Sequence, residues 1–512
     1  MGKSKADLVL RNAGAITFDP SHPKARTIYL QGGHVLKVSS KDVDPVLIGA
    51  ATLVIDCQGR TVIPAFHDAH CHVEAYAESL LNIDISPACV KSIEDIVSRI
   101  KQVAASLPAG TWIRCTGYNE FYLQEKRHPN SRDLDRATTA HPVKLTHRSG
   151  HAHVLNSLAL QLAGITGQSE EPPGGMIERD TQTGEPNGLL FGMGPYLAEK
   201  IPPITGAELE AAIARAGQIL LGLGITTVQD ASPGNGPGRR ARLLEWKRRG
   251  VFLPRTMMMS GAEGAGQPQE ERGTGLCRGA VKIMLDEVRG KLNPSQEELN
   301  RLVLEIHASG RQAAVHAVEE NTIDAAITAL EHAIKKCPRK DSRHRLEHCS
   351  VCTPAAASRL SRLGTVVVTN PAFIYYSGER YLSTVPREQF KHLYAVKTML
   401  DAGLRMAAGS DAPVAGPDPL KGIYAAVTRL AENGQQVLPS QAVSALEALR
   451  MYTLNAAYSC FLEGKLGSIS GGKYADLAVL SGDPLRAGAA ELKDIRVDVT
   501  IMEGKVVHGR AG

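Results

Sequence analysis

Short apolar runs alternate with amphipathic segments through most of the chain. The runs "GITTVQDA", "GAVKIMLDE", "QAAVHAVEE", "HRLEHCSV" and "LRMAAGSDAPV" each precede a segment in which apolar residues recur with helical spacing. Apolar runs of about four to eight residues between turn residues are typical of buried strands, and repeated strand–helix units indicate a parallel sheet. So many units predict an α/β fold, a (β/α)8 TIM barrel, over residues 63–464.

The two ends of the chain have a different sequence pattern from the middle. Strand-like runs broken by glycine occur near the N-terminus ("DLVLRNAGAITFD", "TIYLQGGHVLKVSS") and again near the C-terminus ("GKYADLAVLSGDP", "VDVTIMEGKVVHGR"). We therefore predict a small composite β-sandwich domain from residues 1–62 and 465–512. An irregular stretch at about 74–205 is predicted to be an insertion that covers the barrel mouth. Its Trp112, Tyr118, Phe121 and Tyr122 either line an apolar pocket or form the core of the insertion.

Composition narrows the class of protein. The 512 residues carry a net charge of +5, and 43% are hydrophobic, as in an ordinary globular protein. The short basic runs are typical of a solvated helix face, so we expect no nucleic acid partner. No apolar run of about 18 residues or secretory signal is present, so we expect no membrane association. The nine scattered cysteines indicate reduced thiols and a cytoplasmic protein. We expect a small-molecule substrate and a homodimer.

Ionisable residues fall at the ends of the predicted barrel strands. Active sites of such barrels lie at the carboxyl ends of the strands, so these side chains should converge. Imidazole and carboxylate groups together are ligands for zinc, with manganese, iron or cobalt as alternatives, and a carboxylated lysine would bridge two ions. The residues are His70, His72, Lys282, His316, His348 and Asp411.

Each of these residues taken alone has a structural explanation. A single His-x-His pair often lies on the protein surface without binding a metal, and a lone buried histidine is more often a hydrogen-bonded core residue. Lys282 alone would be a salt-bridged lysine, and Asp411 would be a helix N-cap. Their shared position at strand ends is what favours a metal site.

The order His-x-His, Lys, His, His, Asp resembles that of the amidohydrolase superfamily. More narrowly, the chain resembles the YtcJ-like amidohydrolase 3 family, which includes N-substituted formamide deformylases. The likeness runs from "VIPAFHDAHCH" through "SGHAHVLNSLALQLAGI", "HRLEHC" and "GSDAPV" to "GSISGGKYADLAVL". It implies a (β/α)8 barrel with a composite β-sandwich, the six residues above as metal ligands, and Lys282 as the N6-carboxylated bridge between two zinc ions. His151 would be a substrate contact or oxyanion helper, or a residue that orders its loop.

The sequence departs from the family pattern after the bridging lysine. The family often has Lys-x-x-x-Asp-Gly, whereas this chain has "KIMLDEV", with Glu287 in place of glycine. The loop that follows this strand, and its contacts with substrate, should therefore differ from those of the family.

The expected chemistry follows from these ligands. Metal ions lower the pKa of a water and give a hydroxide nucleophile, and Asp411 acts as general base and then as acid. The expected activity is hydrolysis of a carbon–nitrogen bond other than a peptide bond: an amide, a cyclic amide or an N-formyl group. Ester or lactone hydrolysis, hydration or decarboxylation at the same site remain alternatives, as does a catalytically silent binding protein.

Overall fold

The computed structural model describes residues 5–172, 174–261, 270–271, 273–288 and 290–510. The chain divides into two compact units. The first contains Met1–Val73 and Ala214–Gly512, and the second contains Glu74–Ile213. The second unit overlaps the predicted insertion at about 74–205.

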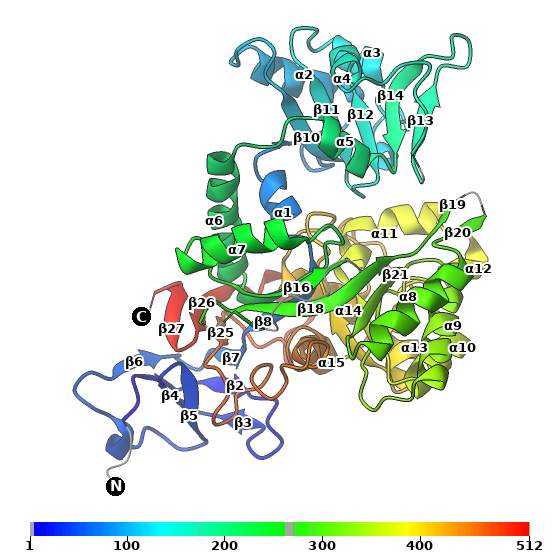
Figure 1. Cartoon of the computed structure of the whole chain (residues 1–512). Helices are drawn as coiled ribbons and strands as arrows, with labels where there is room; N and C mark the ends of the chain where they lie inside the picture. The colour runs from blue at the N-terminus through cyan, green and yellow to red at the C-terminus, as the bar shows by residue number, and fades with distance from the viewer. Residues whose placement is uncertain (1–4, 173, 262–269, 272, 289, 511–512) are drawn as a thin grey trace. The chain divides into compact units, whose positions relative to one another are not determined.

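The first unit contains a barrel (Figure 1). Within its described residues, eight strands pair in parallel in the order β24-β23-β22-β21-β18-β16-β15-β8. Backbone hydrogen bonds from Asp411 N to His70 O (2.7 Å) and from His72 N to Ala412 O (2.9 Å) join the two ends of this sheet. The predicted parallel barrel is therefore confirmed. Its strands are β8 (Phe66–Cys71), β15 (Ile225–Asp230), β16 (Arg255–Ser260), β18 (Leu276–Met284), β21 (Ala313–Ala317), β22 (Arg345–His348), β23 (Val366–Thr369) and β24 (Arg405–Ala408).

Helices follow most barrel strands, as the amphipathic segments predict. Side-chain caps begin two of them: Ser295 accepts from Glu298 N at 3.3 Å, and Thr353 accepts from Ala356 N at 3.2 Å. No helix in the described ranges combines the length and the apolar character needed to cross a membrane. The helices of the barrel include α7 (Pro237–Arg248), α8 (Gln296–Ala308), α9 (Glu320–Lys336), α10 (Pro354–Arg362), α11 (Ala372–Thr384), α13 (Val396–Asp401), α14 (Pro419–Thr428), α15 (Ala445–Met451) and α16 (Leu454–Tyr458).

The barrel strands are buried on both faces. Every residue of β8, β15, β22 and β23 is buried. β23 is an apolar run, as expected of a strand covered on both faces, whereas β8, β15 and β22 also carry polar and charged side chains. Burying a polar group is costly unless it is hydrogen-bonded, and burying a charge is costly unless it is paired. The polar side chains within these strands therefore need partners inside the barrel.

The first unit also contains two sheets outside the barrel, and one of them combines strands from both ends of the chain. One sheet has the order β5-β4-β1-β6, and the other has the order β27-β26-β25-β7-β2-β3. In the second, β7 (Thr61–Pro64) pairs antiparallel with β25 (Leu477–Leu480), which joins the two termini. One hydrophobic cluster contains residues of both sheets. That these sheets form a domain separate from the barrel stays a prediction. Their other strands are β1 (Leu8–Arg11), β2 (Gly14–Ile16), β3 (Lys24–Ala25), β4 (Thr27–Gln31), β5 (His34–Ser39), β6 (Leu53–Asp56), β26 (Val497–Met502) and β27 (Lys505–His508).

The second unit is built on a mixed sheet. Its order is β13-β14-β12-β11-β10-β9, and helix α2 (Ile93–Ala104) contributes apolar residues to its core. Tyr118 is fully buried in this core and Trp112 packs against a neighbouring cluster, so these two aromatic residues belong to the core of the unit. The strands are β9 (Ile83–Asp84), β10 (Ile113–Tyr118), β11 (Val143–His147), β12 (Ala152–Leu155), β13 (Met176–Arg179) and β14 (Pro186–Phe191).

Gly409 lies where the backbone after β24 passes His70. A Cβ at this position would lie 2.4 Å from His70 N and 2.6 Å from His70 Cβ, which is closer than any real contact. We expect Gly409→Ala to lower the free energy of unfolding by about 1–3 kcal/mol, as overpacking does. A urea titration measures this loss. Gly464→Ala is the matched control because nothing lies within 4 Å of its Cβ, and it should change stability by less than about 0.5 kcal/mol. Equal stability of the two variants would contradict the expectation.

Candidate metal centre

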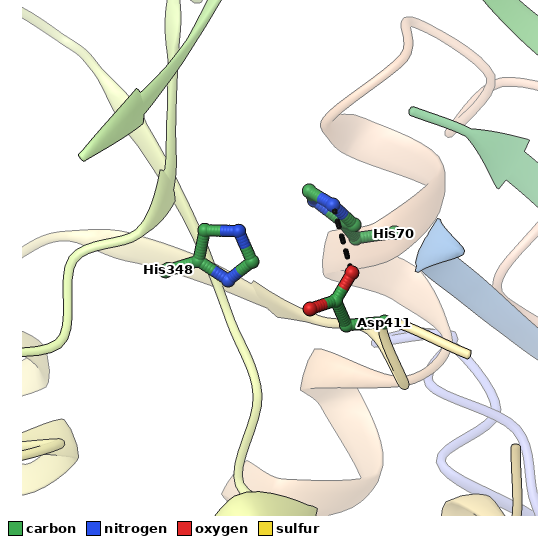
Figure 2. Close-up of side chains that lie close together, drawn as sticks. All are labelled: His70, His348 and Asp411. Atoms are coloured by element: carbon green, nitrogen blue, oxygen red, sulfur yellow. Dashed lines mark ion pairs between the residues drawn. The ribbon is translucent and has the colours of Figure 1, made fainter. Parts of the chain in front are cut away.

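Two histidines and an aspartate meet at the carboxyl end of β8. His70 lies in the strand and is fully buried, and His72 follows the strand and is partly buried. Asp411 comes from the loop after β24, and its Oδ1 lies 3.4 Å from His70 Nε2 and 3.0 Å from His72 Nε2. Figure 2 shows His70 and Asp411 facing one another. The predicted convergence of β8 and the "GSD" loop is therefore observed.

His348 completes a compact group. It ends β22, and the candidate ligand atoms of His70, His348 and Asp411 all lie within 4.8 Å of one another (Figure 2). The ring of His316, from β21, lies 4.6 Å from the ring of His348, centroid to centroid. The four histidines and the aspartate named in the sequence thus gather at one end of the barrel.

The Nδ1 atoms of three of these histidines are held by neighbouring side chains. His70 Nδ1 lies 2.5 Å from Glu347 Oε2, His72 Nδ1 lies 3.0 Å from Ser232 Oγ, and His348 Nδ1 lies 2.7 Å from Asn370 Oδ1. Such outer contacts orient a ligating imidazole and leave its other nitrogen for the metal. His70 Nε2 is buried and has no hydrogen-bond partner among the described residues. An unpartnered buried imidazole nitrogen beside a carboxylate is suited to bind a divalent cation.

Asp68 fastens β8 to the loop that carries Asp411. Its carboxylate accepts from Ser410 N (2.9 Å), Ser410 Oγ (2.6 Å) and His70 N (3.1 Å). Ser410 Oγ in turn accepts from Ala412 N at 3.0 Å. Asp411 itself has a φ of 58°, in the left-handed region, which these bonds hold in place. The loop therefore presents the Asp411 carboxylate to the histidines in one fixed orientation.

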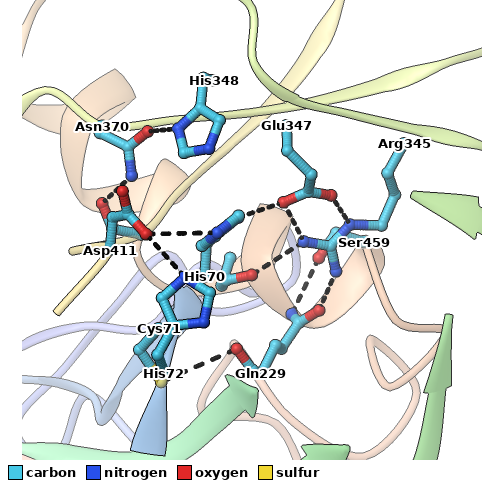
Figure 3. A network of polar contacts seen from close by, with 12 residues as sticks. His70, Cys71, His72, Gln229, Arg345, Glu347, His348, Asn370, Asp411 and Ser459 are labelled. Atoms are coloured by element: carbon cyan, nitrogen blue, oxygen red, sulfur yellow. Dashed lines mark hydrogen bonds and ion pairs between the residues drawn. The ribbon is translucent and has the colours of Figure 1, made fainter. Parts of the chain in front are cut away.

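A buried charged network contacts His70 through Glu347 (Figure 3). Arg345 donates to both oxygens of Glu347, from Nε to Oε1 at 2.7 Å and from Nη2 to Oε2 at 2.9 Å. Arg345 also donates to Gln229 Oε1 and, at 2.8 Å, to Ala69 O. Gln229 Nε2 donates to Ala456 O and Ser459 Oγ. The side chains of Arg345 and Glu347 are at most 1% exposed, so the pair is compensated inside the barrel.

Burial sets the protonation of the site. It lowers the pKa of His70 to about 3, even though Glu347 opposes the shift, and it also lowers the pKa of His316 and His348. These rings are therefore neutral at pH 7, which is the form that binds metal ions. Burial alone would raise the pKa of Asp411, but the hydrogen bond with His72 and the neighbouring histidines hold it well below its usual range. Asp411 is therefore a carboxylate at neutral pH.

Lys282 is buried in the barrel, whereas His151 is exposed in the second unit. Lys282 lies in β18 and is buried; burial lowers its pKa, and the nearby carboxylates of Glu347 and Asp411 oppose that shift. His151 lies in the second unit, exposed at the turn before β12. The structure thus brings Lys282 near the cluster, whereas the role of His151 stays a prediction.

The segment that contains Glu287, where the sequence departs from the family pattern, forms a β-hairpin. Residues Asp286–Val288 form β19, which pairs with β20 (Lys291–Asn293), and Glu287 Oε2 accepts from Asn321 Nδ2 at 3.0 Å. Asp286 Oδ1 lies 3.7 Å from His316 Nε2. Where the family often has glycine, this chain therefore has a side chain that ties the hairpin to α9.

Sequence reasoning missed the supporting residues. The run "HRLEHC" contains Arg345 and Glu347 as well as His348, but its position at a strand end predicts a ligand only at His348. The signal was available: charged residues two apart in a buried strand point to the same face and must find partners. Ser232 and Asn370 lie in the loops after β15 and β23, and nothing in the sequence around them indicates that they contact histidines.

The fold and the cluster together define a (β/α)8-barrel protein with histidines and an aspartate at the carboxyl ends of its strands. A model of the amidohydrolase family matches residues 53–508, so the chain belongs to that family.

Similar proteins cover nearly the whole chain. The N-substituted formamide deformylase of Arthrobacter pascens is 28% identical over 542 residues, which span 99% of each chain. YtcJ of Bacillus subtilis (strain 168), designated an amidohydrolase, is 29% identical over 518 residues, spanning 95% of this chain and 97% of YtcJ. An uncharacterized metal-dependent hydrolase from Pyrococcus horikoshii OT3 has a similar fold, with a TM-score of 0.74, 22% identity and coverage of 94% of this chain and 99% of that one.

Proposed function

We propose that the protein is a metal-dependent hydrolase that cleaves a carbon–nitrogen bond other than a peptide bond. The observation that carries this proposal is the buried group of His70, His348 and Asp411, with an unpartnered His70 Nε2. Membership of the amidohydrolase family supports the reaction class.

The residues that would hold the metal are those gathered at the barrel end. They are His70, His72, His316, His348 and Asp411, and we propose two zinc ions, with manganese, iron or cobalt as alternatives. Lys282 would be N6-carboxylated and bridge them. Burial lowers the pKa of Lys282, which favours the uncharged amine. Only that form can add to carbon dioxide, forming an N–C bond and releasing a proton.

The reaction needs a nucleophile, a proton acceptor and a proton donor. A bound divalent ion supplies Lewis acidity, which polarises a carbonyl and lowers the pKa of a water. Asp411, held as a carboxylate against His72, would accept the proton of the attacking water. It would then return that proton to the departing nitrogen, so that an amine leaves in place of an amide anion.

The substrate class is an amide, a cyclic amide or an N-formyl amine. The name of the Arthrobacter pascens relative supports the N-formyl choice. We further propose His151 as a substrate contact that helps to polarise the carbonyl oxygen.

A hydrolysis screen of the zinc-loaded protein tests this proposal. N-formyl amines, N-acyl amines, cyclic amides and matched esters are incubated with wild-type protein, and released amine or acid is measured. We expect turnover of at least one nitrogen compound, and a slower reaction or none with its matched ester. Turnover of esters alone would overturn the C–N assignment, and no turnover of any class would overturn the hydrolase itself.

A further inference from the structure

The two nitrogens of His70 face two different carboxylates. Nδ1 lies 2.5 Å from Glu347 Oε2, and Nε2 lies 3.4 Å from Asp411 Oδ1. Only the shorter contact is a hydrogen bond, and His70 Nε2 has no partner among the described residues. A neutral imidazole carries one proton, so Glu347 places that proton on Nδ1 and leaves the lone pair on Nε2.

Arg345 holds the Glu347 carboxylate in the position from which it accepts the Nδ1 proton of His70. Its Nε and Nη2 donate to the two oxygens of Glu347 at 2.7 and 2.9 Å. Arg345 is itself held by the oxygen of Gln229 and by Ala69 O, on strands β15 and β8. Because a guanidinium stays protonated in proteins, Glu347 stays a pure acceptor toward His70.

We propose that Glu347 and Arg345 are positioning residues that set the tautomer of His70 and aim its Nε2 lone pair into the centre of the site. The use of that lone pair as a metal ligand rests on the proposed function. The tautomer itself does not, because it follows from the contacts of His70 with Glu347 and Asp411.

Two double variants distinguish the effect of the hydrogen-bond acceptor at position 347 from the effect of the Arg345–Glu347 ion pair. Both Arg345→Met/Glu347→Leu and Arg345→Met/Glu347→Gln remove the buried ion pair as a unit, a change that folded proteins often tolerate. With leucine, the Asp411 oxygen is the carboxylate left facing the ring, so the proton should move to Nε2. With glutamine, the amide oxygen can still accept from Nδ1, so the wild-type tautomer should persist. If Arg345 and Glu347 only stabilise the fold, the leucine and glutamine variants should have the same His70 tautomer.

The tautomer is read from nitrogen NMR of metal-free protein labelled at its histidine ring nitrogens. His70→Gln assigns the signals of His70, and a urea titration of each variant checks folding. We expect a proton on Nδ1 in the wild type and in the glutamine variant, and on Nε2 in the leucine variant. A wild-type His70 with its proton on Nε2 would overturn the proposal even if neither variant folds, and so would identical tautomers in the two variants.

Cobalt affinity gives a second readout, measured by visible absorption of the Co²⁺-loaded protein in competition with a chelator. We expect the leucine variant to bind about 10–100-fold more weakly than wild type, and the glutamine variant to recover most of that loss. The matched control is Asp341→Asn/Arg343→Met, because Arg343 forks onto Asp341 at 2.7 and 2.8 Å with the same two-residue spacing. This control should bind Co²⁺ like wild type.

If the predicted tautomers appear but wild type binds no metal, the proposed function fails and the positioning role stands.

Discussion

Replacing Asp411 by asparagine should lower kcat/KM by about 10²–10⁴-fold, the usual contribution of a general acid–base group. Asparagine has nearly the same shape, so the backbone bonds that hold this loop to His70 should persist. What is lost is the carboxylate that faces His70 and His72 and accepts the proton of the attacking water. The measurement is steady-state kinetics on the best substrate of the screen, with metal content determined on the same samples.

The matched control for this substitution is Asp44→Asn. Asp44 caps a short helix among the terminal sheets by accepting from Val46 N, a bond that asparagine can also accept. Its activity should equal that of wild type. An Asp411→Asn enzyme that keeps its metal and more than about a tenth of the wild-type rate would show that Asp411 is not the proton acceptor.

Removing the metal should abolish activity and leave the fold intact. A bound ion is worth several kcal/mol of transition-state stabilisation, and about 4 kcal/mol corresponds to a thousandfold in rate. Dialysis against a chelator should therefore lower the rate by at least about a thousandfold, and adding Zn²⁺, Mn²⁺ or Co²⁺ should restore it. Circular dichroism before and after dialysis checks that the barrel persists.

Magnesium and calcium serve as the control ions in this experiment. They prefer sites built from oxygen ligands, whereas the group here is mostly imidazole. Neither ion should restore the rate. Full activity after exhaustive chelation would contradict a metal-dependent mechanism.

The barrel could be predicted from sequence because its strands are buried on both faces. The residues of β21 and β23, for example, form short apolar runs, and each run is followed by a helical pattern. Because active sites of such barrels lie at the carboxyl ends of the strands, the predicted barrel then points to His70, His316 and His348 as candidate ligands. The pairing of the terminal strands is harder to predict, because β7 meets β25 across more than 400 residues of chain.

The second unit illustrates what the sequence could not reveal. Its strands are short and mix parallel with antiparallel pairing, so the alternation of apolar and polar residues in β10 and β11 does not predict which strands pair or in which direction. Gly188 adopts a positive φ at a place where a Cβ would lie 2.4 Å from Leu155 O, a close approach that depends on the folded chain. The partners of His70 were hidden for a related reason. Glu347 and Arg345 acquire their meaning only when β22 lies across the barrel from β8.

The most direct test of the central claim is the metal content of the purified protein, measured by mass spectrometry of the elements. Wild-type protein prepared without chelator should hold about two equivalents of a divalent transition metal, as a two-metal site requires. Lys282→Ala should hold fewer, and His348→Ala fewer still, whereas His34→Ala, a change at an exposed histidine of β5, should match wild type. Wild-type protein that holds no transition metal, even after loading with Zn²⁺, would contradict the account.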